Sequence, residues 1–182
     1  MFQALSSKVI SGVVSLGMLL FSSYEGNIAE FGELNISYGK NRVIFKTELR
    51  NAFENDFEEV FKSGHTFEIN FEIKLKSGSR ILHEGTFIHS VKYDPMEQYY
   101  HVYLQDSERN ILIADFNRLK EVISEIEYEY NGDIPTRMKI YFTAYLNKMR
   151  LSNDYKEYDM MMLWKFKKPK IKTTIIKPDY ES

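Results

Sequence analysis

The chain of 182 residues contains no cysteine. This absence excludes disulfides, zinc sites built on thiolates, cysteine nucleophiles and the lipidated cysteine that anchors a lipoprotein. Positive charge is not in excess either, because 24 Lys and Arg residues face 26 Asp and Glu residues, so we expect no nucleic-acid partner. The nucleophile elbow, the phosphate loop, the dinucleotide fingerprint and the HExxH motif are all missing. These absences argue against an enzyme, and we expect no catalytic residue, no cofactor and no metal.

The N-terminus carries a short apolar segment. Residues 9–21 form an apolar run of 13 residues after Lys8. A membrane span needs roughly 20 residues, whereas the apolar core of a secretory signal peptide has this length. We interpret residues 1–22 as a signal peptide or N-terminal anchor and residues 23–32 as a linker. The alternative is a buried N-terminal helix of a cytoplasmic protein, and the Gly and Ser residues in the run count against it because they are poor helix formers.

Residues 33–176 are predicted to form a single β-rich domain, followed by a tail at 177–182. Aromatic residues make up 15% of the chain, and aromatic rings favour strands. Residues 66–76 alternate apolar and polar side chains without a break, which predicts a strand with one buried face. Similar patterns predict further strands at 34–37, 42–49, 80–93, 98–105, 136–147 and 157–166, and the basic tail can add an edge strand.

Turn residues connect the strand at 66–76 to its successors as an antiparallel meander with one buried face. For the first hairpin we expect Leu75 opposite Ile81, which sets Phe71 opposite Gly85. For the second we expect Val102 beside His89.

Two amphipathic helices interrupt the strands. The first, at 52–63, has an apolar stripe that includes Phe53 and Phe57, with Asn51 as its cap and Gly64 at its end. The second, at 116–126, is capped by Asp115. The predicted fold class is therefore mainly β (α+β): an antiparallel β-sandwich or curved sheet with two short amphipathic helices.

The histidines and the acidic clusters do not predict a metal site. His83 and His89 share a strand face but lie about 20 Å apart at 3.3 Å per residue, too far for one metal, so we expect buried histidines with hydrogen-bond partners. The acids at 54–59 and at 121–133 leave two interpretations open, cation binding or a solvated face, and their distribution favours the solvated face.

Lysines interleaved with aromatic residues near the C-terminus form the first candidate binding site. Its residues are Trp164, Lys165, Phe166, Lys167, Lys168, Lys170 and Lys172. Such a segment suits anionic lipid headgroups or an acidic protein, although the pattern favours the alternative, an edge strand kept soluble by charge. A second candidate is an exposed patch on the opposite strand face. Its residues are Tyr141, Tyr145, Met161 and Leu163.

Two segments carry a resemblance to a known family. They are LRNAFENDFEEVFKSGHTFEINFEI (residues 49–73) and YYHVYLQDSERNILIADFNRLKEVISEI (residues 99–126). With the order of elements around them, residues 33–176 resemble the bacterial envelope family called domain of unknown function 4390. The resemblance implies a β-rich exported protein outside the inner membrane, and it lends no activity and no functional residues.

We therefore expect a non-enzymatic, exported cell-envelope domain, periplasmic or anchored to the outer side of the inner membrane. It would serve as a protein-interaction or structural module whose partner is an envelope protein or an anionic membrane surface. The alternative is a β-sandwich carrier that holds an apolar or lipid ligand between its sheets.

Overall fold

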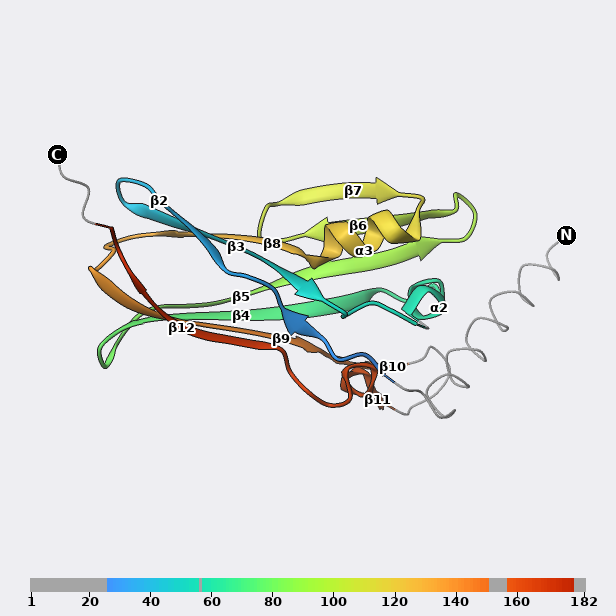
Figure 1. Ribbon diagram of the computed structural model, residues 1–182. Helices are drawn as coiled ribbons and strands as arrows, with labels where there is room; N and C mark the ends of the chain where they lie inside the picture. The colour runs from blue at the N-terminus through green and yellow to red at the C-terminus, as the bar shows by residue number, and fades with distance from the viewer. Residues whose placement is uncertain (1–25, 56, 151–156, 179–182) are drawn as a thin grey trace, which may run out of the picture.

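The computed structural model describes residues 26–55, 57–150 and 157–178 (Figure 1). Most of these residues belong to two antiparallel sheets. The smaller sheet contains β1 (Glu30–Phe31), β2 (Asn35–Tyr38), β3 (Arg42–Arg50) and β8 (Glu125–Asn131), with β3 at its centre. The larger sheet has the order β12-β9-β4-β5-β6-β7. Its strands are β4 (Phe67–Ser77), β5 (Arg80–Asp94), β6 (Tyr99–Leu104), β7 (Arg109–Ile113), β9 (Arg137–Leu146) and β12 (Lys170–Ile176).

Three helices and a short strand pair complete the described fold. The α-helices are α2 (Phe57–Phe61) and α3 (Phe116–Ser124), and η1 (Met160–Trp164) is a 3₁₀ helix. The strand pair consists of β10 (Lys148–Arg150) and β11 (Glu157–Asp159). The predicted fold class, a mainly β antiparallel fold with two short α-helices, is confirmed.

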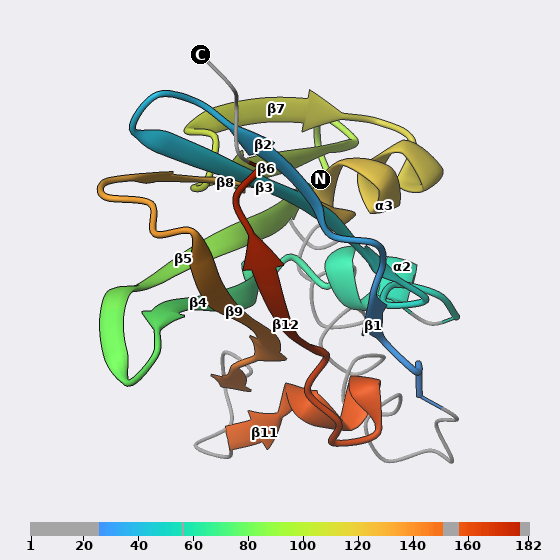
Figure 2. The ribbon, with the colours of Figure 1, turned by 60° about the vertical axis from the view of Figure 1, so that its left-hand side comes forward.

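The two sheets pack face to face and share one core. Phe142 of β9 meets Phe45 of β3 edge to face, with ring centroids 6.4 Å apart, and Tyr128 of β8 lies 5.4 Å from Phe87 of β5. The inward side chains of β4 are all buried between the sheets. They alternate along the strand with polar residues, which point to the outer face of the larger sheet. Figure 2 shows β3 and β8 on one side of β4, β5 and β9.

The meander of the larger sheet has the predicted order but a different register. Leu75 pairs with His83 and Phe71 pairs with Phe87, which is two residues away from the expected pairing. The reason is a tight turn, where Ser77 pairs with Arg80, followed by an irregularity between Leu75 and Lys76. The next hairpin shows the same offset, because Leu104 rather than Val102 lies opposite His89. A shift of two residues keeps every side chain on its expected face.

Both predicted helices exist, but their bounds differ from the prediction. Helix α2 begins only at Phe57, and Asn51 does not cap it, since that residue adopts a positive φ of 53° in a bend. Helix α3 is capped as predicted, because the Asp115 carboxylate accepts a hydrogen bond from the backbone N–H of Arg118. It ends at Ser124 rather than at residue 126, because the chain turns there into β8, a strand that was not predicted.

The predicted strand at 157–166 is confirmed for its first three residues and wrong for the rest. Only β11 is extended there, and the chain then winds into η1 after Asp159, whose side chain accepts a hydrogen bond from the backbone N–H of Met161. A 3₁₀ turn places residues three apart on the same side, so Met160 is buried with Leu163 and Met161 is buried with Trp164.

The ends of the chain also differ from the expected division. The predicted linker at 23–32 is partly wrong, because β1 pairs with the end of β3 and Asn27 and Ala29 are buried. The predicted tail strand is confirmed as β12, an edge strand paired with β9. The signal or anchor predicted at 1–22, the start of the linker and residues 179–182 lie outside the described residues.

Candidate functional site

The outer face of the larger sheet carries a strip of basic and aromatic side chains along its β12–β9 edge. We call it the lysine–tyrosine strip. Its members are Lys168, Lys170, Lys172, Tyr141 and Tyr145. Register explains the arrangement, because Lys172 pairs with Tyr141 and Lys170 pairs with Thr143, and these positions all point away from the core. The strip thus unites lysines of the first predicted site with the two tyrosines of the second.

Ammonium groups lie over both tyrosine rings of the strip. The Nζ atom of Lys168 is 4.4 Å from the ring centroid of Tyr145, and Nζ of Lys172 is 5.8 Å from that of Tyr141. Lys76 of β4 approaches Tyr141 from the other side, also at 5.8 Å. Cation–π contacts leave the positive charge in place. The strip therefore presents a surface that is both cationic and aromatic.

The lysines of the strip lack acidic partners among the described residues. Elsewhere on the surface, several basic side chains are paired with carboxylates, for example Lys46 with Glu127 and Lys74 with Glu84. No ion pair within the described part of the chain includes any of the three strip lysines. Burial, followed by the nearby Glu72 carboxylate, raises the pKa of the Tyr145 hydroxyl, so that side chain stays neutral at ordinary pH. The strip lysines are therefore free of ion pairs within the described residues, and Glu72 is an acidic neighbour of the strip through its contact with Tyr145.

Three residues of the predicted sites lie in the core instead. Trp164 is fully buried, and its Nε1–H donates a hydrogen bond to the backbone oxygen of Ala52 at 2.9 Å. Met161 and Leu163 are buried as well, so their predicted place in an exposed patch is wrong. The cause is η1, which buries Met160, Met161, Leu163 and Trp164 together, whereas a strand would have pointed alternate residues to opposite faces.

The other predicted lysines lie in a loop between η1 and β12. Lys165 to Lys168 are all exposed, and Phe166 is among the most exposed large apolar side chains that the structure describes, at 68%. The loop leads directly into the lysine–tyrosine strip, because Lys168 belongs to both. The residues of the first predicted site thus form one continuous exposed surface, except for Trp164, which is buried.

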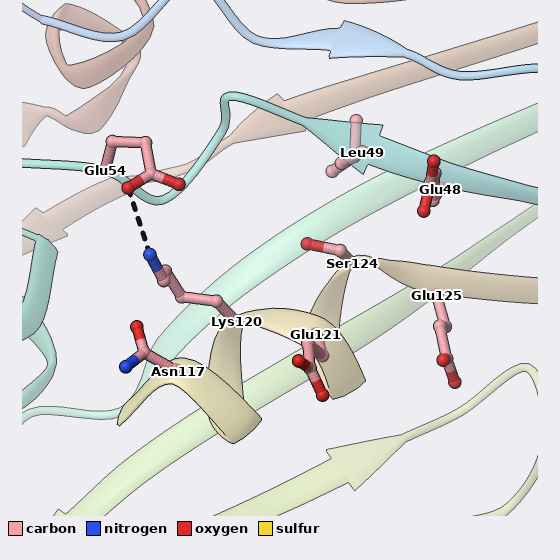
Figure 3. Close-up of a pocket in the computed structure, with 8 residues that line it drawn as sticks. All are labelled: Glu48, Leu49, Glu54, Asn117, Lys120, Glu121, Ser124 and Glu125. Carbon is pink, nitrogen blue, oxygen red and sulfur yellow. Dashed lines mark hydrogen bonds and ion pairs between the residues drawn. The ribbon is translucent and has the colours of Figure 1, made fainter. Parts of the chain in front are cut away.

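An acidic pocket of about 420 Å³ lies between the end of β3 and helix α3. Figure 3 shows Glu54 and Lys120 joined by an ion pair, 3.0 Å long, with Glu121 beside Lys120 on α3 and with Glu48 and Glu125 at the other side of the pocket. Glu48 also pairs with Arg50, and Glu121 pairs with Arg118. Much of the negative charge is thus balanced within the protein.

One group of side chains in the described part of the chain has metal-ligand geometry. Ligand atoms of Asp94, Glu97 and His101 lie within 4.8 Å of one another on the exposed β5–β6 hairpin. The backbone N–H groups of Glu97 and Met96 donate to the Asp94 carboxylate and hold its pKa below its usual value. These bonds are ordinary turn chemistry, so they explain the position of Asp94 without a metal.

His89 is fully buried in the core, and each of its two ring nitrogens lies close to a hydrogen-bond acceptor. Its Nε2 lies 3.1 Å from the Asp106 carboxylate, and its Nδ1 lies 2.9 Å from the backbone oxygen of Ile123. Both neighbours are acceptors, so only a doubly protonated ring donates to both. Asp106 also accepts from the backbone N–H of Glu127. The pair therefore ties β5, the β6–β7 turn, α3 and β8 together.

Asp106 is ionised in this arrangement. Burial raises the pKa of its carboxyl, but the hydrogen bond and the charge of His89, together with backbone N–H groups, outweigh the burial and hold the pKa below its usual value.

The prediction that the two strand histidines find hydrogen-bond partners is confirmed, because His83 lies 2.6 Å from the Tyr128 hydroxyl. Gly85 leaves room for that contact, since a Cβ there would lie 2.8 Å from the same hydroxyl.

Comparisons add no relative to this picture, since no family model, curated protein or solved structure matches the chain. Within the described residues, no helix combines the length and the hydrophobicity that crossing a membrane requires.

Proposed function

We propose that the protein is a non-enzymatic domain of the bacterial cell envelope that binds a negatively charged partner through the lysine–tyrosine strip. The observation that carries the proposal is the grouping of exposed, unpaired lysines over half-buried tyrosines on the outer face of the larger sheet. Charge of one sign, left without partners on a protein whose net charge is −2, provides the attraction for an anionic surface.

The side of the molecule formed by β3, β8 and α3 offers less free positive charge than the strip. Acidic and basic side chains are equal in number on these elements, and the basic ones are paired with carboxylates. An anionic partner is therefore attracted to the strip rather than to this side.

The alternative function, a carrier of an apolar ligand between the sheets, has less support. The inward side chains of both sheets form one cluster of buried residues, with many aromatic rings in contact. The depressions found among the described residues open to the surface, and none is lined by the inward faces of both sheets. A ligand would therefore have to displace packed core residues.

Binding is tested by NMR titration of the full chain with two soluble anionic probes, glycerol phosphate and a hexaglutamate peptide. We expect the largest signal changes at Lys168, Lys170 and Lys172 and in the rings of Tyr141 and Tyr145, and we expect salt to reduce them because screening weakens exposed charges. A lysine without strip neighbours, Lys40 in the β2–β3 turn, serves as the internal control. Equal changes at Lys40 and the strip would contradict the proposal.

Location is tested separately, by fractionating native cells and sequencing the N-terminus of the mature protein. A start near residue 23 in the periplasm, or an intact N-terminus in the membrane fraction, is expected for an exported or anchored domain. An intact N-terminus in the cytosol would contradict the envelope assignment and leave the binding proposal standing.

A further inference from the structure

The loop that links η1 to β12 presents an exposed phenylalanine between lysines. Phe166 is 68% exposed, and Lys165, Lys167 and Lys168 beside it are exposed as well. Large apolar side chains at the surface are ordinary when scattered singly. Here the ring is surrounded by positive charge, which is the pattern of a segment that places an apolar side chain between lipids while its lysines contact headgroups.

Backbone hydrogen bonds hold this loop in one conformation. The N–H groups of Lys165 and Phe166 donate to carbonyl oxygens of η1, and the N–H of Lys167 donates to the oxygen of Trp164 at 2.9 Å. Lys165 and Phe166 both have positive φ values, 50° and 57°, which side-chain-bearing residues rarely adopt. The strained backbone directs the ring away from the core, so the loop needs little ordering before it binds.

The N-terminal end of the described chain is fixed against the same loop. The backbone N–H of Asn27 donates to the oxygen of Leu163 at 2.8 Å. Gly26 lies so close to Lys165 that a Cβ on it would be 2.9 Å from the Lys165 Cγ atom. Figure 2 shows η1 beside the start of the described chain.

This junction limits the distance between the loop and the apolar run at 9–21. Five Cα-to-Cα steps separate Phe21 from Gly26, and a fully extended chain covers about 17 Å in that number of steps. A bilayer that holds the apolar run is therefore within reach of the loop.

We infer that the loop of Lys165–Lys168 is a membrane-contact site that inserts Phe166 among anionic lipids, with the lysine–tyrosine strip continuing along the headgroups. The inference rests on the proposed function, because it names the anionic partner as a lipid surface. Three observations carry it: the exposed ring among lysines, the backbone that holds the ring outward, and the entry of the chain beside it. Lipids provide both the anionic headgroups for the lysines and the apolar interior for the ring.

The test uses the absence of native cysteine, which makes a single introduced cysteine a unique labelling site. The full chain carrying Phe166→Cys is labelled with a polarity-sensitive fluorophore and mixed with vesicles of phosphatidylcholine alone or with added phosphatidylglycerol. The control is Met96→Cys, because Met96 is 74% exposed but lies in a turn beside Asp94 and Glu97. Both sites are exposed apolar positions, and they differ in the sign of the neighbouring charge.

We expect a blue shift and a several-fold rise in emission at position 166 with phosphatidylglycerol vesicles, a smaller change with neutral vesicles, and no change at position 96. Replacing Lys165 and Lys167 by Gln in the labelled chain should weaken the response about fivefold per lysine. A probe at 166 that stays as polar as the probe at 96 would overturn the inference. So would a response to polyglutamate without a response to vesicles, although that result would leave the proposed anionic-partner function intact.

Discussion

Replacing His89 or Asp106 by alanine should lower the free energy of unfolding by about 3–5 kcal/mol, the loss typical of a buried ion pair that is deprived of one partner. The His89 ring is fully buried, and the side chain of Asp106 is 2% exposed. Removing the imidazole leaves the carboxylate without its strongest donor, and removing the carboxylate leaves a ring nitrogen without an acceptor. Urea unfolding followed by circular dichroism measures the effect.

The exposed pair of Lys62 and Glu58 provides the matched control, because its atoms are 2.6 Å apart but both side chains are more than two-fifths exposed. Lys62→Ala should cost less than about 1 kcal/mol. Similar losses for the buried and the exposed pair would contradict the central role assigned to His89 and Asp106.

Lowering the pH should reduce the contribution of Asp106 to the free energy of unfolding. The pKa of its carboxyl is lowered in the folded state, so its stabilisation is present above the unfolded value near 3.9 and is lost as pH falls through the folded value. The stability gap between the wild type and Asp106→Asn should therefore narrow as the pH falls below about 4.

The sequence predicts which side chains face the core better than it predicts how strands align. Alternation from Thr66 to Lys76 is enough to identify β4 and its buried face. The partner of Leu75, however, depends on the turn and on an irregularity beside it, and neither leaves a mark in the hydrophobic pattern because the pattern repeats every two residues.

Short segments with two compatible patterns account for the other differences. Ile126 continues the apolar stripe of α3 and equally begins the alternation of β8, and only the pairing of β8 with β3 decides between helix and strand. The run from Met160 to Trp164 is apolar at every position and therefore has no periodicity of its own. Such a run is compatible with a buried strand and equally with a buried 3₁₀ turn.

The residues of the candidate site could be predicted from the sequence, but their grouping into one surface could not. The lysines near the C-terminus and Tyr141 and Tyr145 were both identified as binding residues, but as separate sites. Their union depends on the antiparallel pairing of β12 with β9, which sets Lys172 beside Tyr141. The buried pair of His89 and Asp106 was out of reach for a related reason, because the partners are 17 residues apart and meet only when the β6–β7 turn folds over β5.

The most direct measurement of the central claim compares two charge variants of the full chain in their binding to vesicles. The first replaces the three strip lysines, Lys168, Lys170 and Lys172, by Gln. The second replaces three basic residues elsewhere on the surface, Lys40, Lys92 and Arg109, by Gln. Both variants lose the same charge, and the ratio of binding to phosphatidylglycerol vesicles over neutral vesicles cancels any contribution of the apolar N-terminal run.

Each lysine near an anionic surface contributes about 1 kcal/mol, so the strip variant should lower this ratio about a hundredfold in low salt. The control variant should stay close to the wild type, and added salt should remove most of the difference. Equal losses in the two variants, or no loss in the strip variant, would contradict the claim that the lysine–tyrosine strip is the binding surface.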